Sequence, residues 1–474
     1  MLRKNDEITG TVTGYTSEGQ GVLRAPDGQA VFVADAIAGE TARVRIEHIG
    51  HNAAYGRIVR LETVSPHRVE RDCPLGKRCG GCDFWHMDYA EELRLKAQRV
   101  RDALVRIGGF DPGEVPILGA ERCYGYRNKA QYPVAPGESG PVAGFFRARS
   151  HEVLPVERCL IQPEAADLAK RAVLDWMRRF SIPAWDETRH AGMVRHIHVR
   201  TATGQVLVCV VCTARPPHAE ELITMVRGAV PTLKTLVVSV HSGRGNAVLG
   251  KELIPLWGDG SVEETLCGLR FRLSARSFFQ VNRAQAERLY ELALELAGPA
   301  KTALDLYCGT GTITLCLARQ AGKVYGVEVV EDAVADAKEN AAQNEIENVE
   351  FFCADAGEAA ERFAKDGVHP ELIVVDPPRK GLSEDVIGAI MQMSPERVVY
   401  VSCDPATLAR DVARLGAGYG PMRVEAVDMF PRCAHVETVV MLSHKKPDSV
   451  INVKVEFGEG EGKVPLDNIA KRAA

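Results

Sequence analysis

Two residues near the C-terminal end of the chain have the types needed for covalent chemistry on a ring. Cys403 follows an apolar run at residues 398–401, and Glu437 stands at the start of the run at 436–442. A thiolate can add to an electron-poor ring carbon, and a carboxylate can then remove the proton from the neighbouring carbon. A free cysteine is more often a small buried apolar residue. The catalytic interpretation therefore depends on whether the same region offers a binding pocket.

A glycine-containing loop in the same region predicts such a pocket. Residues 304–311 read Leu-Asp-Leu-Tyr-Cys-Gly-Thr-Gly, a strand that runs into a turn and then a helix. Glycines let a cofactor approach the backbone, and the helix N-terminus offers free N–H groups. Acidic residues close the next three predicted strands, namely Glu328, Asp355 and Asp376. Ligands of parallel sheets bind at these strand ends, so we expect Glu328 at a ribose diol and Asp355 at an adenine edge.

A third group of chemically active residues is a set of cysteines in the first half of the chain. Cys73, Cys79 and Cys82 are close in sequence, and Cys159 follows later. Four thiolates in a reducing compartment are typical of an iron–sulfur cluster, and zinc is the competing occupant. The glycines at 80–81 allow the tight wrap that N–H donors to cluster sulfurs require. The sequence predicts a metal site here, with iron–sulfur favoured over zinc.

Composition limits the class of protein that positions these residues. The chain has 474 residues, 46% hydrophobic and 26% charged, which is the globular average and excludes wholesale disorder. We expect no secretory signal and no membrane span, because no apolar run is long enough, and a cytoplasmic location follows. The formal charge of −5 divides into +6 for residues 1–283 and −11 for residues 284–474. A basic front half is compatible with a polyanionic partner or with ordinary solvated surface.

The hydrophobic pattern predicts four regions. Residues 1–62 carry five short β-runs that suit a small OB-like barrel, a common nucleic-acid platform. Residues 63–283 mix strands and helices as an α+β domain. Residues 284–444 alternate strand and helix, which predicts a doubly wound sheet of seven strands whose last two form an antiparallel hairpin. Residues 445–474 form an extension.

Taken together, these motifs resemble the RNA uracil-5-methyltransferase family over residues 1 to about 444. The four cysteines match the family's 4Fe–4S ligands, and residues 4–61 resemble its TRAM domain. Residues 126–129 (Tyr-Arg-Asn-Lys) and 278–282 (Phe-Phe-Gln-Val-Asn) match two further family motifs. The resemblance implies an N-terminal TRAM barrel of OB type, a central α+β domain and a Rossmann-like class I methyltransferase domain.

The resemblance also implies roles for individual residues and a substrate. Cys403 falls on the family's nucleophile and Glu437 on its base. The positions that contact S-adenosyl-L-methionine are Gln280, Tyr307, Gly309, Thr312, Glu328, Asp355 and Asp376. The TRAM-like region and the cysteines favour the branch that methylates C5 of a flipped-out uridine in 23S ribosomal RNA. Arg127, Lys129, Arg147 and Arg149 are expected to track phosphates, and the protein is expected to be a monomer.

Two alternative functions stay open, and the sequence departs from the family pattern at three positions. The chain could act on transfer RNA, or it could be a non-catalytic RNA-binding assembly factor; cytosine C5 methylation is disfavoured because its enzymes place their cysteines differently. Asp404 stands where the family often has Asn, Cys433 where it usually has Thr, and Thr312 where well-known members have Asn. The first two changes bear on the environment of the nucleophile, and the third on one donor contact.

Overall fold

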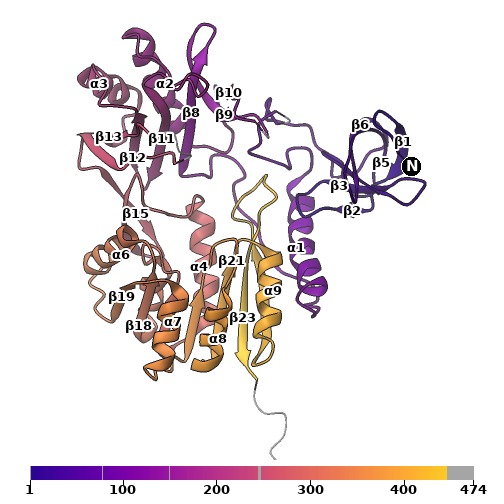
Figure 1. Ribbon diagram of the computed structural model, residues 1–474, viewed down its shortest axis with the longest axis vertical. Helices are drawn as coiled ribbons and strands as arrows, with labels where there is room; N and C mark the ends of the chain where they lie inside the picture. Colours follow the sequence, from indigo (N-terminus) through magenta and orange to yellow (C-terminus); the bar gives the residue numbers. More distant parts are fainter. Residues whose placement is uncertain (1, 77, 149, 244–246, 446–474) are drawn as a thin grey trace, which may run out of the picture.

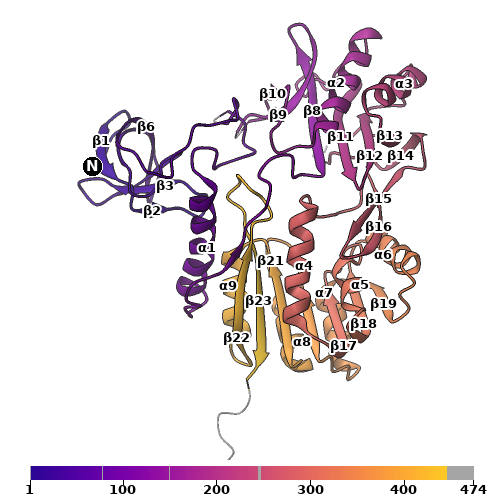
Figure 2. The same cartoon turned by 180° about the vertical axis from the view of Figure 1, so that it is seen from behind.

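The computed structural model describes residues 2–76, 78–148, 150–243 and 247–445. Arg149 and the extension at 446–474 lie outside the described residues. The N-terminal sheet stands to one side, the central domain lies above the C-terminal domain, and α1 (Tyr89–Arg106) runs between the N-terminal sheet and the C-terminal domain (Figure 1). The same arrangement is visible from behind in Figure 2. Among the described residues, no helix has the length and apolar character needed to cross a membrane.

The N-terminal region forms a curved antiparallel sheet with one parallel pair. Its strands are β1 (Glu7–Thr11), β2 (Gly14–Tyr15), β3 (Gly21–Arg24), β4 (Ala30–Val33), β5 (Thr41–Ile49) and β6 (Ala54–Thr63), in the order β1-β5-β6-β4-β3-β2. The sequence predicts one strand at residues 10–15, whereas the structure has two. The chain changes partner there, because β1 pairs with β5 and β2 pairs with β3. Within the described residues β1 and β2 do not pair, so the expected barrel is an open half-barrel.

The central domain is a seven-stranded sheet packed against two helices. Its elements are β8 (Lys129–Gly137), β9 (Gly140–Phe146), β10 (Val153–Pro155), α2 (Glu164–Arg179), β11 (Val194–Ala202), β12 (Gln205–Cys212), α3 (Ala219–Ala229), β13 (Leu233–Val240) and β14 (Glu252–Trp257). A separate hairpin of β15 (Ser261–Leu266) and β16 (Leu269–Ser274) connects it to the C-terminal domain. Alternate residues of β11 and β12 pack against α2 and α3, which explains their apolar runs.

The C-terminal sheet has the order β19-β18-β17-β20-β21-β23-β22-β7. The first five strands are parallel, and β23 runs antiparallel to both neighbours. The seven predicted strands are β17 (Ala300–Leu306), β18 (Ala321–Glu328), β19 (Val349–Cys353), β20 (Leu372–Val375), β21 (Arg397–Ser402), β22 (Tyr419–Val427) and β23 (Glu437–His444). The eighth, β7 (Ile117–Leu118), comes from a distant part of the sequence and was not predicted, because two residues carry no readable periodicity.

Helices cover both faces of this sheet. They are α4 (Arg283–Ala297), α5 (Thr312–Leu317), α6 (Glu331–Gln343), α7 (Ala356–Lys365), α8 (Glu384–Met393) and α9 (Pro405–Leu415). Apolar residues of α4, α5 and α6 form one core, and those of α7, α8 and α9 form the other. Val100 and Leu104 of α1 join the second core. A helix from the first quarter of the chain is therefore part of the C-terminal domain's packing.

Candidate active site

Three residues of the loop after β17, one tyrosine and two glycines, have a positive φ angle. Tyr307 has φ 74°, Gly309 φ 55° and Gly311 φ 81°. A left-handed conformation is strained for a tyrosine, and such strain is found mainly at functional sites. A Cβ at Gly311 would lie 3.1 Å from the Ala337 Cβ and 3.2 Å from the Phe351 ring, whereas one at Gly309 would meet nothing within 4 Å. Gly311 is therefore required by packing, and Gly309 leaves its surroundings open to a ligand.

Acidic residues at the strand ends hold this loop and face the space above it. The amide of Gly309 donates to Glu328 Oε2 at 3.1 Å, and Val330 N donates to Oε1 at 2.9 Å. Asp305 is fully buried and accepts from Thr314 Oγ1 at 2.6 Å. Burial, together with Asp376 and Glu328, raises the pKa of Asp305 to about 7. Burial also raises the pKa of Asp376 to about 7.

A small cavity collects most of the predicted donor-binding residues. Its volume is about 40 Å³, and it is lined by Phe278, Phe279, Gln280, Tyr290, Asp305, Tyr307, Cys308, Gly309, Thr310, Thr312, Ile313 and Asp376. Glu328 and Asp355 are not among the lining residues. Asp355 caps α7, with its Oδ1 accepting from Gly357 N at 2.8 Å. Asp355 therefore has a structural role as a helix cap, and its expected contact with an adenine edge stays a prediction.

Gln280 is held in place by the predicted Tyr-Arg-Asn-Lys motif. Asn128 Nδ2 donates to the Gln280 carbonyl at 2.9 Å, and Asn128 N donates to the Val281 carbonyl at 2.7 Å. Arg200 of β11 is completely buried and bonds to the carbonyl of Ser277 in the same loop. The central domain therefore supports the loop that brings Gln280 to the cavity.

Cys403 and Glu437 lie at the same edge of the sheet on neighbouring strands. The last pair of the β21–β23 ladder is Ser402 with Thr438, so Cys403 and Glu437 directly follow and precede it. Burial raises the pKa of the Cys403 thiol to about 11, with further contributions from Glu437 and Asp376. Burial and Asp376 raise the pKa of Glu437 to about 8. Because these groups shift one another's pKa values, the thiol of Cys403 and the carboxyls of Glu437 and Asp376 lie in one poorly solvated site.

Two nearby residues complete this picture, and one of them was not predicted. Tyr290 of α4 is buried and accepts a hydrogen bond from Thr312 Oγ1 at 3.4 Å. Burial and the charges of Asp376 and Glu437 raise the pKa of its hydroxyl. Tyr290 links the small cavity to the Cys403 side of the site; its only sequence signal was a tyrosine among the apolar positions of a helix. Asp404 accepts from Ala406 N at 2.9 Å and Thr407 N at 3.1 Å. Its side chain therefore caps α9, a role that Asn fills equally well.

The four predicted metal ligands lie around one large cavity. Cys73, Cys79, Cys82 and Cys159 all line a hollow of about 820 Å³. Cationic side chains of Arg127, Lys129, Arg147 and Arg158 line it too. Burial, Arg200 and Arg127 lower the pKa of Lys129 to about 8. Among the described residues, no three His, Cys, Asp or Glu side chains are close enough to share a single metal ion.

The fold and the site together define a methyltransferase-type α/β enzyme. The structure is similar to that of Pyrococcus abyssi tRNA (uracil-54, C5)-methyltransferase in complex with S-adenosyl-L-homocysteine, with a TM-score of 0.75 and 26% identity over 92% of this chain and 99% of that one. Residues 261–445 match the family model described as tRNA (Uracil-5-)-methyltransferase.

Relatives in sequence extend the match to almost the whole chain. A protein of Clostridium tetani named as an uncharacterized RNA methyltransferase is 40% identical over 449 residues, 94% of this chain and 97% of the relative. One of Halalkalibacterium halodurans with the same description is 41% identical over 451 residues, 94% of this chain and 98% of the relative. The chain belongs to the RNA uracil-5-methyltransferase family. The expected activity class, S-adenosylmethionine-dependent RNA (uracil-5) methylation, is thereby confirmed; the residue roles, the ribosomal substrate, the TRAM identity and the iron–sulfur cluster stay predictions.

Proposed function

We propose that this protein methylates C5 of a specific uridine in 23S ribosomal RNA through a covalent adduct with Cys403. The observation that supports this most directly is the meeting of Cys403, Glu437 and Asp376 at neighbouring strand ends beside the loop of Tyr307. C5 of uracil is too weak a nucleophile to accept a methyl group unaided. The protein must therefore activate the ring before the transfer.

The proposed reaction has three steps: addition, methyl transfer and elimination. The Cys403 thiol loses its proton to water, the thiolate adds to C6 of the uracil, and the electron pair moves onto the ring as an enolate. C5 then attacks the methyl carbon of the donor, the C5–CH3 bond forms, and S-adenosyl-L-homocysteine leaves. Glu437 takes the proton from C5, the C6–S bond breaks, and the thiolate of Cys403 is restored.

The raised pKa values fit this sequence of steps. A thiol with a pKa of about 11 is protonated in the free protein, so it needs a positive charge to become a nucleophile. The sulfonium of the donor supplies that charge, and the guanidinium of Arg379 lowers the pKa values of both Cys403 and Glu437. A carboxyl with a pKa of about 8 is a stronger base than an ordinary glutamate. It is therefore suited to take a proton from carbon.

The donor is assigned to the loop and the strand ends described above. Gln280, Tyr307, Gly309, Thr312 and Asp376 would hold it over the small cavity, with Glu328 at the ribose and Asp355 at the adenine edge. Each Glu328 oxygen already accepts one backbone N–H and keeps a lone pair for a hydroxyl. The small cavity of about 40 Å³ would take only part of the donor, and the rest would lie along the strand ends.

RNA is assigned to a second hollow between the N-terminal half-barrel and the start of α9. This groove of about 860 Å³ lies between β2, β3, α1 and the start of α9, and it includes Asp404 next to the nucleophile. Four arginines line it, namely Arg24, Arg94, Arg99 and Arg106. Such a groove can follow a phosphate backbone while one base leaves its stack to reach Cys403. The half-barrel is assigned as a TRAM domain on this basis.

The metal site is assigned to a 4Fe–4S cluster held by the four cysteines. The four thiols line one hollow of about 820 Å³, and four cysteine thiolates are the usual ligands of such a cluster. Arginines and Lys129 would balance the negative charge of the thiolates and the cluster. No redox step is needed, so the cluster would shape this region. Iron and acid-labile sulfide in an anaerobic preparation test this assignment, and stoichiometric zinc without visible absorbance would contradict it.

Transfer RNA is the second candidate substrate, favoured by similarity to the Pyrococcus tRNA (uracil-54, C5)-methyltransferase over 92% of the chain. Mass spectrometry of 5-methyluridine in ribosomal and transfer RNA from a deletion strain separates the two. Loss from 23S RNA alone supports the proposal, and loss from transfer RNA alone contradicts it. A Cys403→Ala protein that methylated normally would contradict the role of Cys403, and a wild-type protein that transferred no methyl group to either RNA would favour the non-catalytic alternative. Because one chain carries every assigned residue, a monomer suffices, and we retain the expected cytoplasmic location.

A further inference from the structure

Residues 428–434 form the first seven positions of the nine-residue loop, 428–436, that joins β22 to β23 and leads to the proposed base. Val427, the last residue of β22, pairs with Glu437, the first residue of β23. The loop therefore begins and ends at the position that fixes the Glu437 backbone. Any movement of this loop is transmitted to Glu437 over very few bonds.

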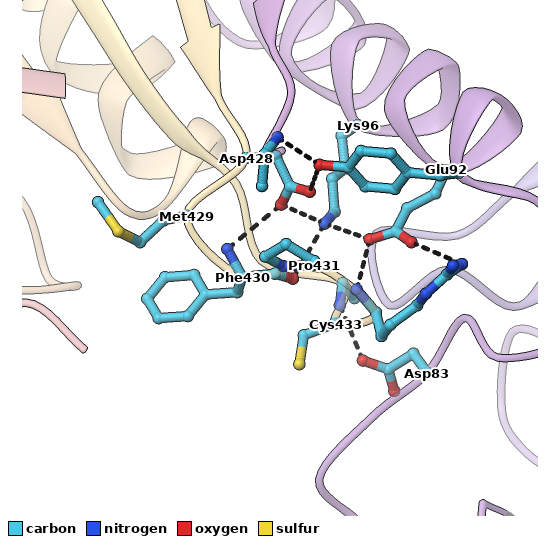
Figure 3. A network of polar contacts seen from close by, with 12 residues as sticks. Asp83, Glu92, Lys96, Asp428, Met429, Phe430, Pro431 and Cys433 are labelled. Atoms are coloured by element: carbon cyan, nitrogen blue, oxygen red, sulfur yellow. Dashed lines mark hydrogen bonds and ion pairs between the residues drawn. The ribbon is translucent and has the colours of Figure 1, made fainter. Parts of the chain in front are cut away.

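A completely buried lysine from the other end of the chain holds this loop. Lys96 of α1 donates from Nζ to Asp428 Oδ1 at 2.6 Å, to the Phe430 carbonyl at 3.1 Å and to Glu92 Oε1 at 2.7 Å. Figure 3 shows the lysine between the loop and its helix. The second oxygen of Asp428 accepts from Tyr89 at 2.6 Å. All three hydrogens of the ammonium group are therefore used, two of them on the loop.

The same helix fixes a strained residue in the loop. Arg432 has φ 71°, a left-handed conformation that is unfavourable for an arginine. Its N–H donates to Glu92 Oε1 at 2.7 Å, and its carbonyl accepts from Asp83 N at 2.7 Å and Phe84 N at 3.0 Å. Its guanidinium lies over the ring of Trp85 at 5.2 Å. Such a conformation persists only while the surrounding contacts enforce it.

The loop is also attached to the cysteine-rich segment. Asp83 accepts from Ala434 N at 2.8 Å, and the Cys433 thiol donates to the Gly81 carbonyl at 3.1 Å. Gly81 and Asp83 flank Cys82 in sequence, and Figure 3 shows Asp83 and Cys433 at the lower edge of the network. The segment at 81–96 thus contacts five of the seven residues at 428–434, namely Asp428, Phe430, Arg432, Cys433 and Ala434.

We propose that Lys96 is a positioning residue for proton removal by Glu437, acting through the loop at 428–434. This rests on the proposed roles of Cys403 and Glu437. Lys96 does not reach the reacting atoms; it binds Asp428 and Phe430 and, through Glu92, the strained Arg432. Loss of these bonds frees the hairpin end that carries Glu437 while leaving β21 and Cys403 in place. Methyl transfer precedes proton removal, so only the later step depends on Lys96.

The test compares two steps in the Lys96→Met protein. RNA with uridine at the target measures release of methylated product, and RNA with 5-fluorouridine measures adduct formation alone, since fluorine cannot leave as a cation. We expect release to slow about 10- to 100-fold and adduct formation to change by less than about threefold. Methylated uridine RNA should then accumulate as a denaturant-resistant adduct. Release at the wild-type rate, or an equal loss in both steps, would overturn the inference.

Two further variants keep the test decisive. Lys170→Met is the matched control, because Lys170 is equally buried on a helix and paired with Asp167 at 2.8 Å but does not contact the loop. It should leave the ratio of the two rates unchanged, and the same ratio change in both lysine variants would contradict a specific role. If Lys96→Met does not fold, Tyr89→Phe removes one hydroxyl from Asp428 and should change the ratio in the same direction; an unchanged ratio would overturn the inference.

Hydrogen exchange gives a readout that is independent of activity. Lys96→Met should increase exchange at residues 428–437 in the free protein, and Lys170→Met should not; unchanged protection in Lys96→Met would overturn the inference. If the wild-type protein forms no adduct with 5-fluorouridine RNA, the proposed role of Cys403 fails. The loop contacts are still tested by the exchange data in that case. Iron content of each variant shows whether the cysteine site is retained.

Discussion

Replacing Glu437 by glutamine should change two steps of the reaction in opposite directions. Glutamine keeps the size of the side chain but cannot accept the C5 proton or carry a negative charge. Glu437 is 4% exposed, and its carboxyl is among the groups that raise the pKa of Cys403 to about 11. The same substitution therefore removes the proposed base and relieves the thiol of a neighbouring negative charge.

The expected magnitudes follow from these two roles. A positioned general base contributes about 10²- to 10⁴-fold, so release of methylated RNA should slow by that factor. A neighbouring charge changes a pKa by about one or more, which corresponds to about a tenfold change in thiolate population. Because the pKa of Glu437 is about 8, the wild-type carboxyl is charged only above that pH. Adduct formation should therefore be similar in both proteins near pH 6.5 and faster in Glu437→Gln near pH 9, by about tenfold.

The assay uses purified protein, donor and a short RNA with uridine or 5-fluorouridine at the target. Gel shifts under denaturing conditions measure the adduct, and a labelled methyl group measures transfer. Cys403→Ala is the control that should form no adduct with either RNA. Donor binding to each variant, measured by calorimetry, shows that the pocket is intact.

The reasoning would be refuted by either of two results. One is release of methylated RNA by Glu437→Gln at the wild-type rate, which would exclude Glu437 as the base. The other is slower adduct formation in Glu437→Gln at high pH with normal donor binding. That result would mean that the Glu437 charge assists the thiol and does not oppose it.

The remaining predictions concern the donor pocket. Gly311→Ala should lower the free energy of unfolding by more than Gly309→Ala, because both lose a left-handed glycine at about 1–2 kcal/mol but only Gly311 also meets the Ala337 Cβ at 3.1 Å; equal denaturation midpoints would contradict this. S-adenosylmethionine should bind with proton release, and its affinity should rise from about pH 6 to about pH 8. The pKa values of Asp305 and Asp376 are about 7 in the free protein, and a sulfonium favours their charged forms. S-adenosylhomocysteine lacks that charge and should show a smaller change, measured by calorimetry in buffers of different ionisation enthalpy; identical pH profiles for the two ligands would exclude this coupling. Asp305→Asn should weaken the pH dependence of S-adenosylmethionine binding, and an unchanged profile would assign the coupling to Asp376 alone.

Much of the fold was predictable because its signals are local. Apolar runs alternating with amphipathic helices predicted β17 to β23 and the antiparallel hairpin, and both predictions are confirmed. The resemblance to the RNA uracil-5-methyltransferase family is likewise confirmed. The two-residue strand β7 and the division of the predicted strand at 10–15 were missed. Each depends on which distant strand offers hydrogen-bond partners, and this leaves no pattern in the segment itself.

Some residues of the candidate site can be recognised from the local sequence, and others only from their tertiary contacts. Residue types at strand ends pointed to Cys403 and Asp376, since parallel strands present their carboxyl ends at one edge. Glu437 reaches the same edge because it begins the antiparallel strand β23. Neither Tyr290 nor Lys96 could be recognised in this way, because an aromatic residue or a lysine within a helix is usually core or solvated surface. Their importance comes from the elements packed against them.

The sequence by itself determined the alternation of strands and helices from β17 to β23 and the chemical groups available to the reaction. Only the tertiary structure decided that α1, more than 300 residues from β22 in sequence, would pack against β22 and α9 and bind the loop that leads to Glu437. The physical reason is that periodicity and backbone preference act over a few residues. Burial of a lysine between two carboxylates, by contrast, depends on the complete fold that excludes water from all three.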